Sequence, residues 1–182
     1  MKLNKLTEEE RTLHNKVHEY AVNKHRETGC TYSGYDYKLH LDAVVNVGLQ
    51  YLHLLDENKL ETMCVLSLHD VMEDCRVNWN EIKMLTASNF VSDCVYNLTN
   101  ELGRNRSERA KKTYPKIAKC KYSTFCKICD RIANMKFSYF MNDEKGMFKK
   151  YQDEHQDFWR ALYNKEHGFD KMWKEMATLC SH

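Results

Sequence analysis

The pattern of apolar and polar positions along this chain is helical almost throughout. Runs that alternate with the period of two typical of strands are few, and one proline and six glycines in 182 residues leave little to interrupt helices. Residues 29–34 are expected to form a loop and residues 103–105 a break. The pattern predicts helices at residues 7–28, 38–55, 59–72, 79–85, 88–100, 107–119, 123–137, 146–164 and 169–179.

These predicted helices fit into one domain. The segment from Thr7 to Glu10 has the residues of a capping box, which would start the first helix. The chain contains no internal repeat, low-complexity tract or linker, and its length is sufficient for one sizeable core. The sequence therefore predicts an all-α protein, a single compact helical bundle over residues 1–182.

The clearest chemistry lies in the stretch LHDVMED at residues 68–74. Adjacent His69 and Asp70 can offer a nitrogen and an oxygen to one metal ion. Glu73 follows His69 by four residues and Asp70 by three, so on a continuous helix it would share their face. A carboxylate there would take the proton of an attacking water, as in a metal-assisted hydrolase. Because a lone His-Asp pair is more often an ordinary helix end, further ligands are needed.

Two residues on other predicted helices complete a ligand set. His40 lies in YDYKLHLDAVV (35–45), and Asp130 lies in FCKICDRIAN (125–134). Taken singly, each is more often a packing or surface residue, but together they give the order His, His-Asp, Asp. This order resembles the metal site of the HD phosphohydrolase superfamily. Two imidazoles and two carboxylates suit Mn²⁺ or Fe²⁺ and tolerate Zn²⁺ or Mg²⁺.

Longer motifs make this resemblance more specific. The segment 68–74 is similar to the LHDvvED signature of RelA/SpoT-type alarmone hydrolases, and KICDRIAN (127–134) is similar to their vKLaDrlhN. The entry segment KHR…pY..H of that family resembles KHR (24–26) followed by Tyr37 and His40. Leu98-Thr99-Asn100 stands in the place of its lT segment.

The resemblance implies an HD-domain bundle with a core at about residues 21–136. A C-terminal helical extension at about residues 146–180 resembles uncharacterised HD proteins of bacteria and phages. The family also implies Mn²⁺ as the cofactor. Enzymes of this superfamily with two metals carry extra histidines between the HD pair and the last Asp, and this chain has none between Asp70 and Asp130. One metal is therefore expected, bound by His40, His69, Asp70 and Asp130.

The reaction that the resemblance implies is removal of the 3′-pyrophosphate from (p)ppGpp, a small nucleotide. One position departs from the family, because Cys30 stands where alarmone hydrolases usually carry a phosphate-binding arginine. Either Arg26 compensates or the phosphates lie elsewhere. Two alternatives therefore stay open: an HD nucleotidase or phosphatase acting on a dNMP, a dNTP or an NADPH-like nucleotide, and a non-catalytic nucleotide-binding module.

Acidic, basic and aromatic side chains supply the remaining candidate roles. Glu73, ranked first, and Asp74 would position and deprotonate the attacking water, unless they form a solvated acidic helix end. The resemblance adds Asn134 as a nucleotide contact, and Tyr37 would stack on a base or be buried. A basic run would clamp a polyphosphate or form a solvated face, and its arginines are Arg104, Arg106 and Arg109.

Composition limits the binding partners and the cellular location that we expect for the protein. A net charge of +2 gives no reason to expect specific nucleic-acid binding. The chain has no run of about 18 apolar residues that would span a membrane, and its N-terminus lacks a signal-peptide core, so we expect a cytoplasmic protein. The eight cysteines are then expected to be reduced thiols.

Two features leave alternatives open. Cys126 and Cys129 form a CxxC that would be a zinc or redox motif, but no second pair completes four ligands, and packing on a helix is the other interpretation. The C-terminal region carries Tyr151, Phe158, Trp159 and Trp173 among charged residues. It would form a packed helical cap or a dimer surface, so a homo-oligomer stays open.

Overall fold

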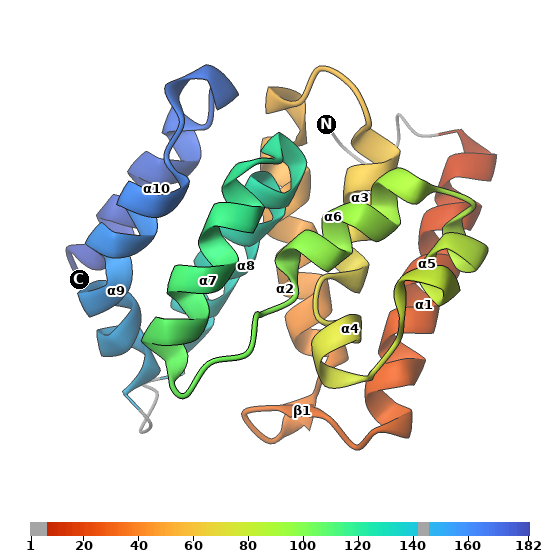
Figure 1. Cartoon of the computed structure of the whole chain (residues 1–182), viewed down its shortest axis with the longest axis horizontal. Coiled ribbons are helices and arrows are strands. Elements are labelled where there is room, and N and C mark those ends of the chain that lie inside the picture. The colour runs from red at the N-terminus through yellow and green to blue at the C-terminus, as the bar shows by residue number, and fades with distance from the viewer. Residues whose placement is uncertain (1–6, 142–145) are drawn as a thin grey trace.

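A computed structural model describes residues 7–141 and 146–182 as an assembly of helices (Figure 1). Residues 1–6, part of the segment that was expected to lack a signal-peptide core, lie outside the described residues. Two short 3₁₀ helices, η2 (Leu52–Leu54) and η3 (Lys165–His167), join longer elements. The α-helices are α1 (Glu8–Glu27), α2 (Lys38–Tyr51), α3 (Lys59–Leu68), α4 (Val71–Asp74), α5 (Trp79–Thr86), α6 (Asn89–Leu98), α7 (Arg106–Ala118), α8 (Lys121–Phe140), α9 (Met147–Leu162) and α10 (Asp170–Cys180).

Local capping explains where α1 begins. The Thr7 hydroxyl accepts a hydrogen bond from the Glu10 amide, and the Glu10 carboxylate accepts one from the Thr7 amide. This is the reciprocal pairing predicted from the sequence, and it satisfies two backbone donors that a helix start leaves free. Asn78 and Glu81 form a second capping box at the start of α5. The all-α prediction is confirmed.

The segment expected to be a loop contains a small hairpin. Strand β1 (Thr31–Tyr32) pairs antiparallel with β2 (Tyr35–Asp36). The two-residue turn between them has positive φ at both Ser33 (50°) and Gly34 (88°), which a tight hairpin turn requires. A serine-glycine pair between tyrosines is a modest signal for this turn, so the pure loop expected here was wrong. The hairpin brings Tyr32 to the first turn of α2, where its ring stacks on His40 with centroids 4.6 Å apart.

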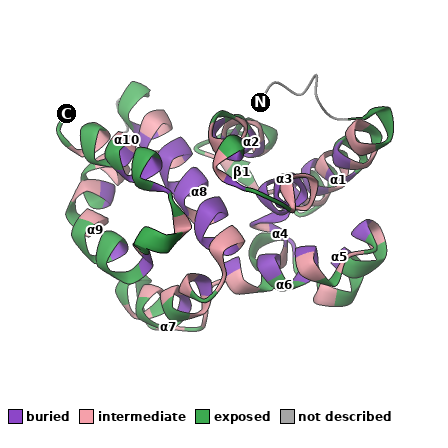
Figure 2. Ribbon diagram, turned by 90° about the horizontal axis from the view of Figure 1, so that it is seen from above, coloured by how far each residue is buried: buried purple, intermediate pink, exposed green. Residues whose placement is uncertain are grey.

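The core lies where α2, α3 and α8 meet, between α9 and α10 at one end and α1 and α5 at the other (Figures 1 and 2). Leu41, Leu66 and Ile128, one from each central helix, are fully buried. Gly48 lets α2 and α3 approach closely, because a Cβ at this position would stand 2.3 Å from a methyl carbon of Leu66. This packing fixes the three helices that carry the candidate metal ligands.

The C-terminal helices form a packed cap on this core. Tyr151, Phe158 and Trp173 are buried, and the Phe158 and Trp173 rings lie 5.6 Å apart between α9 and α10. Of the two interpretations of these aromatic residues, the structure supports the cap. Trp159 is 39% exposed on the outer face of α9, and a homo-oligomer stays a prediction.

A buried polar network joins α1 to the core and predicts how stability depends on pH. The Ser67 hydroxyl on α3 lies between two imidazoles of α1, 3.3 Å from His14 Nε2 and 3.0 Å from His18 Nδ1. His18 Nε2 in turn lies 2.9 Å from a carboxylate oxygen of Asp42 on α2. Burial and the neighbouring His18 lower the pKa of His14 from 6.5 to about 4. The folded protein therefore resists a proton that the unfolded chain accepts.

We expect the protein to lose stability as the pH falls from about 6.5 to about 4. Because the pKa of His14 is lower in the folded state, its contribution is complete above 6.5 and declines below it. Between pH 7.5 and pH 5 this one group should cost about 2 kcal/mol, measured by urea unfolding. A His14→Gln variant should lose that part of the slope, whereas His53→Gln, at an exposed position, should keep it. Equal slopes in all three proteins would show that His14 is not responsible.

Candidate metal centre

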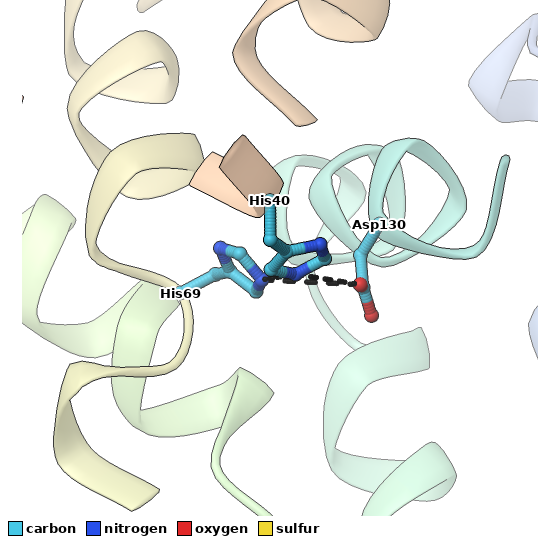
Figure 3. Close-up of side chains that lie close together, drawn as sticks. All are labelled: His40, His69 and Asp130. Atoms are coloured by element: carbon cyan, nitrogen blue, oxygen red, sulfur yellow. Dashed lines mark hydrogen bonds and ion pairs between the residues drawn. The ribbon is translucent and has the colours of Figure 1, made fainter. Parts of the chain in front are cut away.

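Three side chains, two on helices and one just after the end of a third helix, converge in the core (Figure 3). His40 comes from the first turn of α2, His69 caps the C-terminus of α3, and Asp130 lies midway along α8. One ligand atom from each lies within 4.8 Å of the others, and all three residues are buried. His40 Nε2 is 3.1 Å from His69 Nε2 and 3.5 Å from Asp130 Oδ1.

The fourth predicted ligand, Asp70, reaches the same cluster from a turn between two helices. Helix α3 ends at Leu68 and α4 starts at Val71, so His69 and Asp70 form the turn between them. Asp70 Oδ2 lies 2.9 Å from His69 Nε2 and 3.5 Å from His40 Nε2. The helix predicted to continue to residue 72 is therefore interrupted, and the argument that Glu73 shares a helix face with His69 and Asp70 does not hold.

The donor set fits one divalent cation. His69 Nδ1 lies 2.9 Å from the Leu66 carbonyl oxygen, so it donates there and leaves the lone pair of Nε2 free to face the cluster. Burial alone would lower the pKa of His69, but the carboxylates of Asp70 and Asp130 raise it to about 9. These carboxylates thus favour a positive charge at the point where the imidazoles meet. Two nitrogens and two carboxylate oxygens around that point suit Mn²⁺ or Fe²⁺.

Neighbouring side chains orient Asp130. The Lys127 ammonium lies 2.9 Å from Asp130 Oδ2, and the Asn134 amide donates to Asp130 Oδ1. The Tyr32 hydroxyl donates to the side-chain oxygen Oδ1 of Asn134 at 2.8 Å. Burial would raise the pKa of Asp130, but Lys127 and His69 lower it below its ordinary value. Asn134, expected to contact nucleotide, is thus engaged in holding a ligand carboxylate.

Tyr37 links Asp70 to the end of α1. Its hydroxyl donates to Asp70 Oδ2 at 2.6 Å, and its ring stacks on buried His25 with centroids 4.0 Å apart and planes 8° apart. His25 Nε2 lies 3.9 Å from Asp74 Oδ2. Partial burial and the nearby charge of Asp70 raise the pKa of Asp74 to about 6. Asp74 therefore belongs to the aromatic and carboxylate shell around Asp70.

Glu73 points to a different partner. Its carboxylate accepts hydrogen bonds from the side-chain amide of Asn100 at 2.9 and 3.0 Å and from the Asn100 backbone amide at 3.4 Å. Asn100 follows α6 and also lines a cavity beside Asp130. Glu73 thus fastens the turn after His69 and Asp70 to the wall of that cavity.

A cationic cavity of about 100 Å³ lies beside Asp130. Arg106 and Arg109, two of the predicted phosphate ligands, reach it from α7. Arg104 does not, because its side chain is 91% exposed and pairs with Glu108. Arg26 is also elsewhere, paired with Asp36 of the hairpin at 2.8 Å. The lining residues are Asn100, Arg106, Arg109, Ala110, Tyr114, Lys127, Asp130, Arg131, Asn134 and Tyr151.

Sequence reasoning missed the part of this cavity that α9 builds. Buried Arg131 donates to Glu154 at 3.0 Å and lies over the Tyr151 ring, 4.7 Å from its centroid. Glu154 also accepts hydrogen bonds from Arg106, so one carboxylate holds two of the arginines. Lys127 and Arg131 flank Asp130 at positions −3 and +1. Two positively charged residues so close to a candidate metal ligand, on a helix that is otherwise largely apolar, were the sequence feature that could have indicated this part of the cavity.

The CxxC residues pack in the core. Cys126 and Cys129 are buried in α8, and burial raises the pKa of both thiols well above the ordinary value. Within the described part of the chain, the group of three or more potential ligands consists of His40, His69 and Asp130, without a cysteine. This arrangement supports the packing interpretation over a zinc motif.

Comparisons with known proteins find a similar fold among solved structures. No family model matches the chain, and no curated protein sequence matches it. The solved structure of a metazoan ortholog of SpoT, a protein that hydrolyses ppGpp and plays a role in starvation responses, is similar with a TM-score of 0.72. The likeness covers 92% of this chain and 93% of that one, at 16% sequence identity. Among the described helices, none is long and apolar enough to cross a membrane. The likeness shows that the two chains share one helical fold, as the sequence predicted.

Proposed function

We propose that the chain is a metal-dependent phosphohydrolase that removes the 3′-pyrophosphate from (p)ppGpp. The observation that carries this proposal is that Asp130 belongs both to the buried His40–His69–Asp130 group and to the lining of the cationic cavity. A phosphate in that cavity would lie beside the candidate metal. The metazoan relative with the same fold hydrolyses ppGpp, which makes this alarmone the first substrate to test.

The proposed cofactor is one divalent cation, Mn²⁺, held by His40, His69, Asp70 and Asp130. When bound, it would supply Lewis acidity that makes water a better nucleophile and polarises a phosphoryl oxygen. Tyr37 and Asn134 hold the two ligand carboxylates through hydrogen bonds, and Leu66 fixes the tautomer of His69. These contacts preorganise the ligands, which is the usual role of groups one layer out from a metal.

Asp74 is the residue that we propose to accept the proton of the attacking water. It lies next to Tyr37 and His25, on the Asp70 side of the cluster, and it is partly exposed, so water can reach it. Glu73 is less well placed, because the Asn100 amide occupies its carboxylate. We therefore rank Asp74 above Glu73, the reverse of the order that the sequence favoured.

Phosphate recognition is assigned to the arginines of α7 and α8. Arg106 and Arg131 share Glu154, which keeps their guanidinium groups at the cavity. The guanidinium of Arg109 has no hydrogen bond or ion pair with another of the described residues, so its donors are available to an anion. Cys30, at the position of the family's phosphate-binding arginine, contacts Thr28 and the Asp74 carbonyl oxygen instead. The cations of the cavity would take over the role of that arginine.

We expect Arg109→Ala to raise KM for the nucleotide by about ten-fold to a hundred-fold while kcat changes little. Loss of one charge-assisted hydrogen bond to phosphate costs about 1.5–3 kcal/mol, and the contact is made before and during reaction. Arg104→Ala is the matched control, because Arg104 belongs to the same basic run but pairs with Glu108 in solvent. Steady-state kinetics of both variants measure the difference. An unchanged KM in both variants would restore the solvated-face interpretation of the whole run.

The proposed activity is tested by incubating the purified protein with Mn²⁺ and a panel of ppGpp, dNTPs, dNMPs and NADPH, with a chelator as control. Pyrophosphate released from ppGpp alone, and lost with chelator, is the expected result. Release of phosphate or pyrophosphate only from another nucleotide would replace the alarmone by that substrate. This second candidate is favoured by one observation, the Cys30 thiol in place of an arginine. Bound metal without turnover of any nucleotide would contradict both.

A further inference from the structure

Two thiols from different helices face each other away from the metal centre. Cys94 lies on α6, Cys120 lies immediately before α8, and their sulfur atoms are 3.7 Å apart. Cys94 is buried, whereas Cys120 is partly accessible to solvent. The Ser123 hydroxyl donates to the Cys94 carbonyl oxygen at 3.3 Å and fixes this contact between α6 and the start of α8. We propose that Cys94 and Cys120 are a thiol pair that peroxide oxidises to a disulfide.

The pair divides the two roles of such a reaction. The hydrogen-bonding contact with Cys94, aided by the first turn of α8, lowers the pKa of Cys120 to about 5. The same contact and burial raise the pKa of Cys94. The thiolate therefore lies on the accessible sulfur, where a peroxide can reach it, and the proton lies on the buried one. Cys120 is the attacking residue and Cys94 the resolving residue.

The oxidation proceeds in two balanced steps. The Cys120 thiolate attacks one oxygen of hydrogen peroxide, the O–O bond breaks, and the departing hydroxide takes a proton from solvent to become water. This leaves a sulfenic acid on Cys120. The sulfur of Cys94 then attacks that of Cys120, the S–O bond breaks, and the departing hydroxide takes the Cys94 proton. One peroxide is reduced to two waters, and two cysteines are oxidised to one disulfide.

The geometry favours this pair over the CxxC. The Cys94 and Cys120 sulfurs must approach by about 1.7 Å to reach the disulfide bond length. Cys126 and Cys129 are both buried with raised thiol pKa values, so neither presents a thiolate to peroxide.

The disulfide would close a ring around one wall of the cavity. The chain from residue 94 to residue 120 carries Asn100 and all of α7, with Arg106 and Arg109. Joining its two ends would restrict the unfolded chain and hold this wall at its base. We expect the oxidised protein to melt about 5 °C or more above the reduced one. This inference does not depend on the proposed substrate or metal.

The test is peptide mapping of the native protein. The reduced protein is treated with one equivalent of hydrogen peroxide, its remaining thiols are alkylated, and it is digested without reductant for mass spectrometry. The expected product is a Cys94 peptide linked to a Cys120 peptide, two hydrogens lighter than the sum and separated by dithiothreitol. Links between other cysteines, or oxidation at Cys30 or Cys180 with no link between residues 94 and 120, would overturn the proposal.

Two variants assign the order of the steps. Cys94→Ala should stop the reaction at a sulfenic acid on Cys120, which dimedone traps. Cys180→Ala is the matched control, because Cys180 is also partly exposed and lies outside the pair, and its cross-link should form as in the native protein. If peroxide oxidised Cys94 in a Cys120→Ala variant as fast as it oxidises Cys120 in the native protein, detected by dimedone labelling, the two roles would be reversed and the assignment contradicted. The native peptide map decides the proposal even if a variant does not fold.

Discussion

Replacing Asp130 with asparagine is expected to remove the bound metal and lower turnover by roughly 10³-fold or more. The substitution keeps the size of the side chain but removes the charge that faces both imidazoles at 3.5 and 3.8 Å. Two nitrogens and one carboxylate would remain as ligands. The Lys127 ammonium, 2.9 Å from Asp130 Oδ2, would also lose its anionic partner and add an unpaired positive charge beside the site. A loss of several kcal/mol of Lewis-acid stabilisation corresponds to this change in rate.

The measurement pairs metal content per chain with turnover under saturating substrate. Asp56→Asn is the matched control, because it makes the same chemical change at a side chain that is 96% exposed. The control should keep both metal and activity. Metal retained at full stoichiometry in Asp130→Asn would exclude Asp130 as a ligand, and circular dichroism would show whether the helices have survived.

The candidate ligand set could be proposed from the sequence because the information for it is local. A His-Asp pair, a histidine at the start of one helix and an aspartate within another are visible as short motifs, and their order along the chain resembles a known site. The structure brings His40, His69 and Asp130 together and places Asp70 beside them. The helices were likewise predictable, since apolar periodicity and the capping residues at Thr7 are properties of neighbouring residues.

The break between α3 and α4 could not be read in the same way. No glycine or proline marks it, and the residues around it suit a helix. It is stabilised by a local hydrogen bond from His69 to the Leu66 carbonyl oxygen and by one across the fold, in which Asp70 accepts from Tyr37, 33 residues away. Such hydrogen bonds override local helix propensity at the candidate site, and the Asn100 contact of Glu73 is the reason why we propose Asp74 ahead of Glu73.

The wall of the cavity that α9 contributes depends on contacts between residues far apart in the sequence. Arg131 and Glu154 are 23 residues apart, and Arg106 and Glu154 are 48 apart. Nothing in the local pattern of α9 distinguishes Glu154 from a surface glutamate, because the choice of partner is made by the packing of α7, α8 and α9. Arg104 and Arg26 show the converse, since charge suited them to phosphate but a nearby carboxylate holds each in solvent.

Replacing Asp74 with asparagine is expected to lower kcat by about 10²-fold or more while the metal stays bound. The amide cannot accept the proton of the attacking water, and loss of a general base typically costs this much. Asp74 is not among the proposed ligands, and its neighbours Tyr37 and His25 are held by other bonds, so the cluster should stay intact. Metal analysis and single-turnover kinetics of pyrophosphate release separate binding from chemistry.

Glu73→Gln is the informative comparison for Asp74→Asn. Glutamine keeps an oxygen that can accept from the Asn100 amide, so the tie between the α4 turn and the cavity wall is largely preserved. We expect its kcat to fall less than ten-fold. A larger loss in Glu73→Gln than in Asp74→Asn would return the proton-transfer role to Glu73 and would mean that its bond to Asn100 opens when substrate binds. Comparable losses of about 10²-fold in both variants would indicate that the two carboxylates share the proton, since neither could then replace the other.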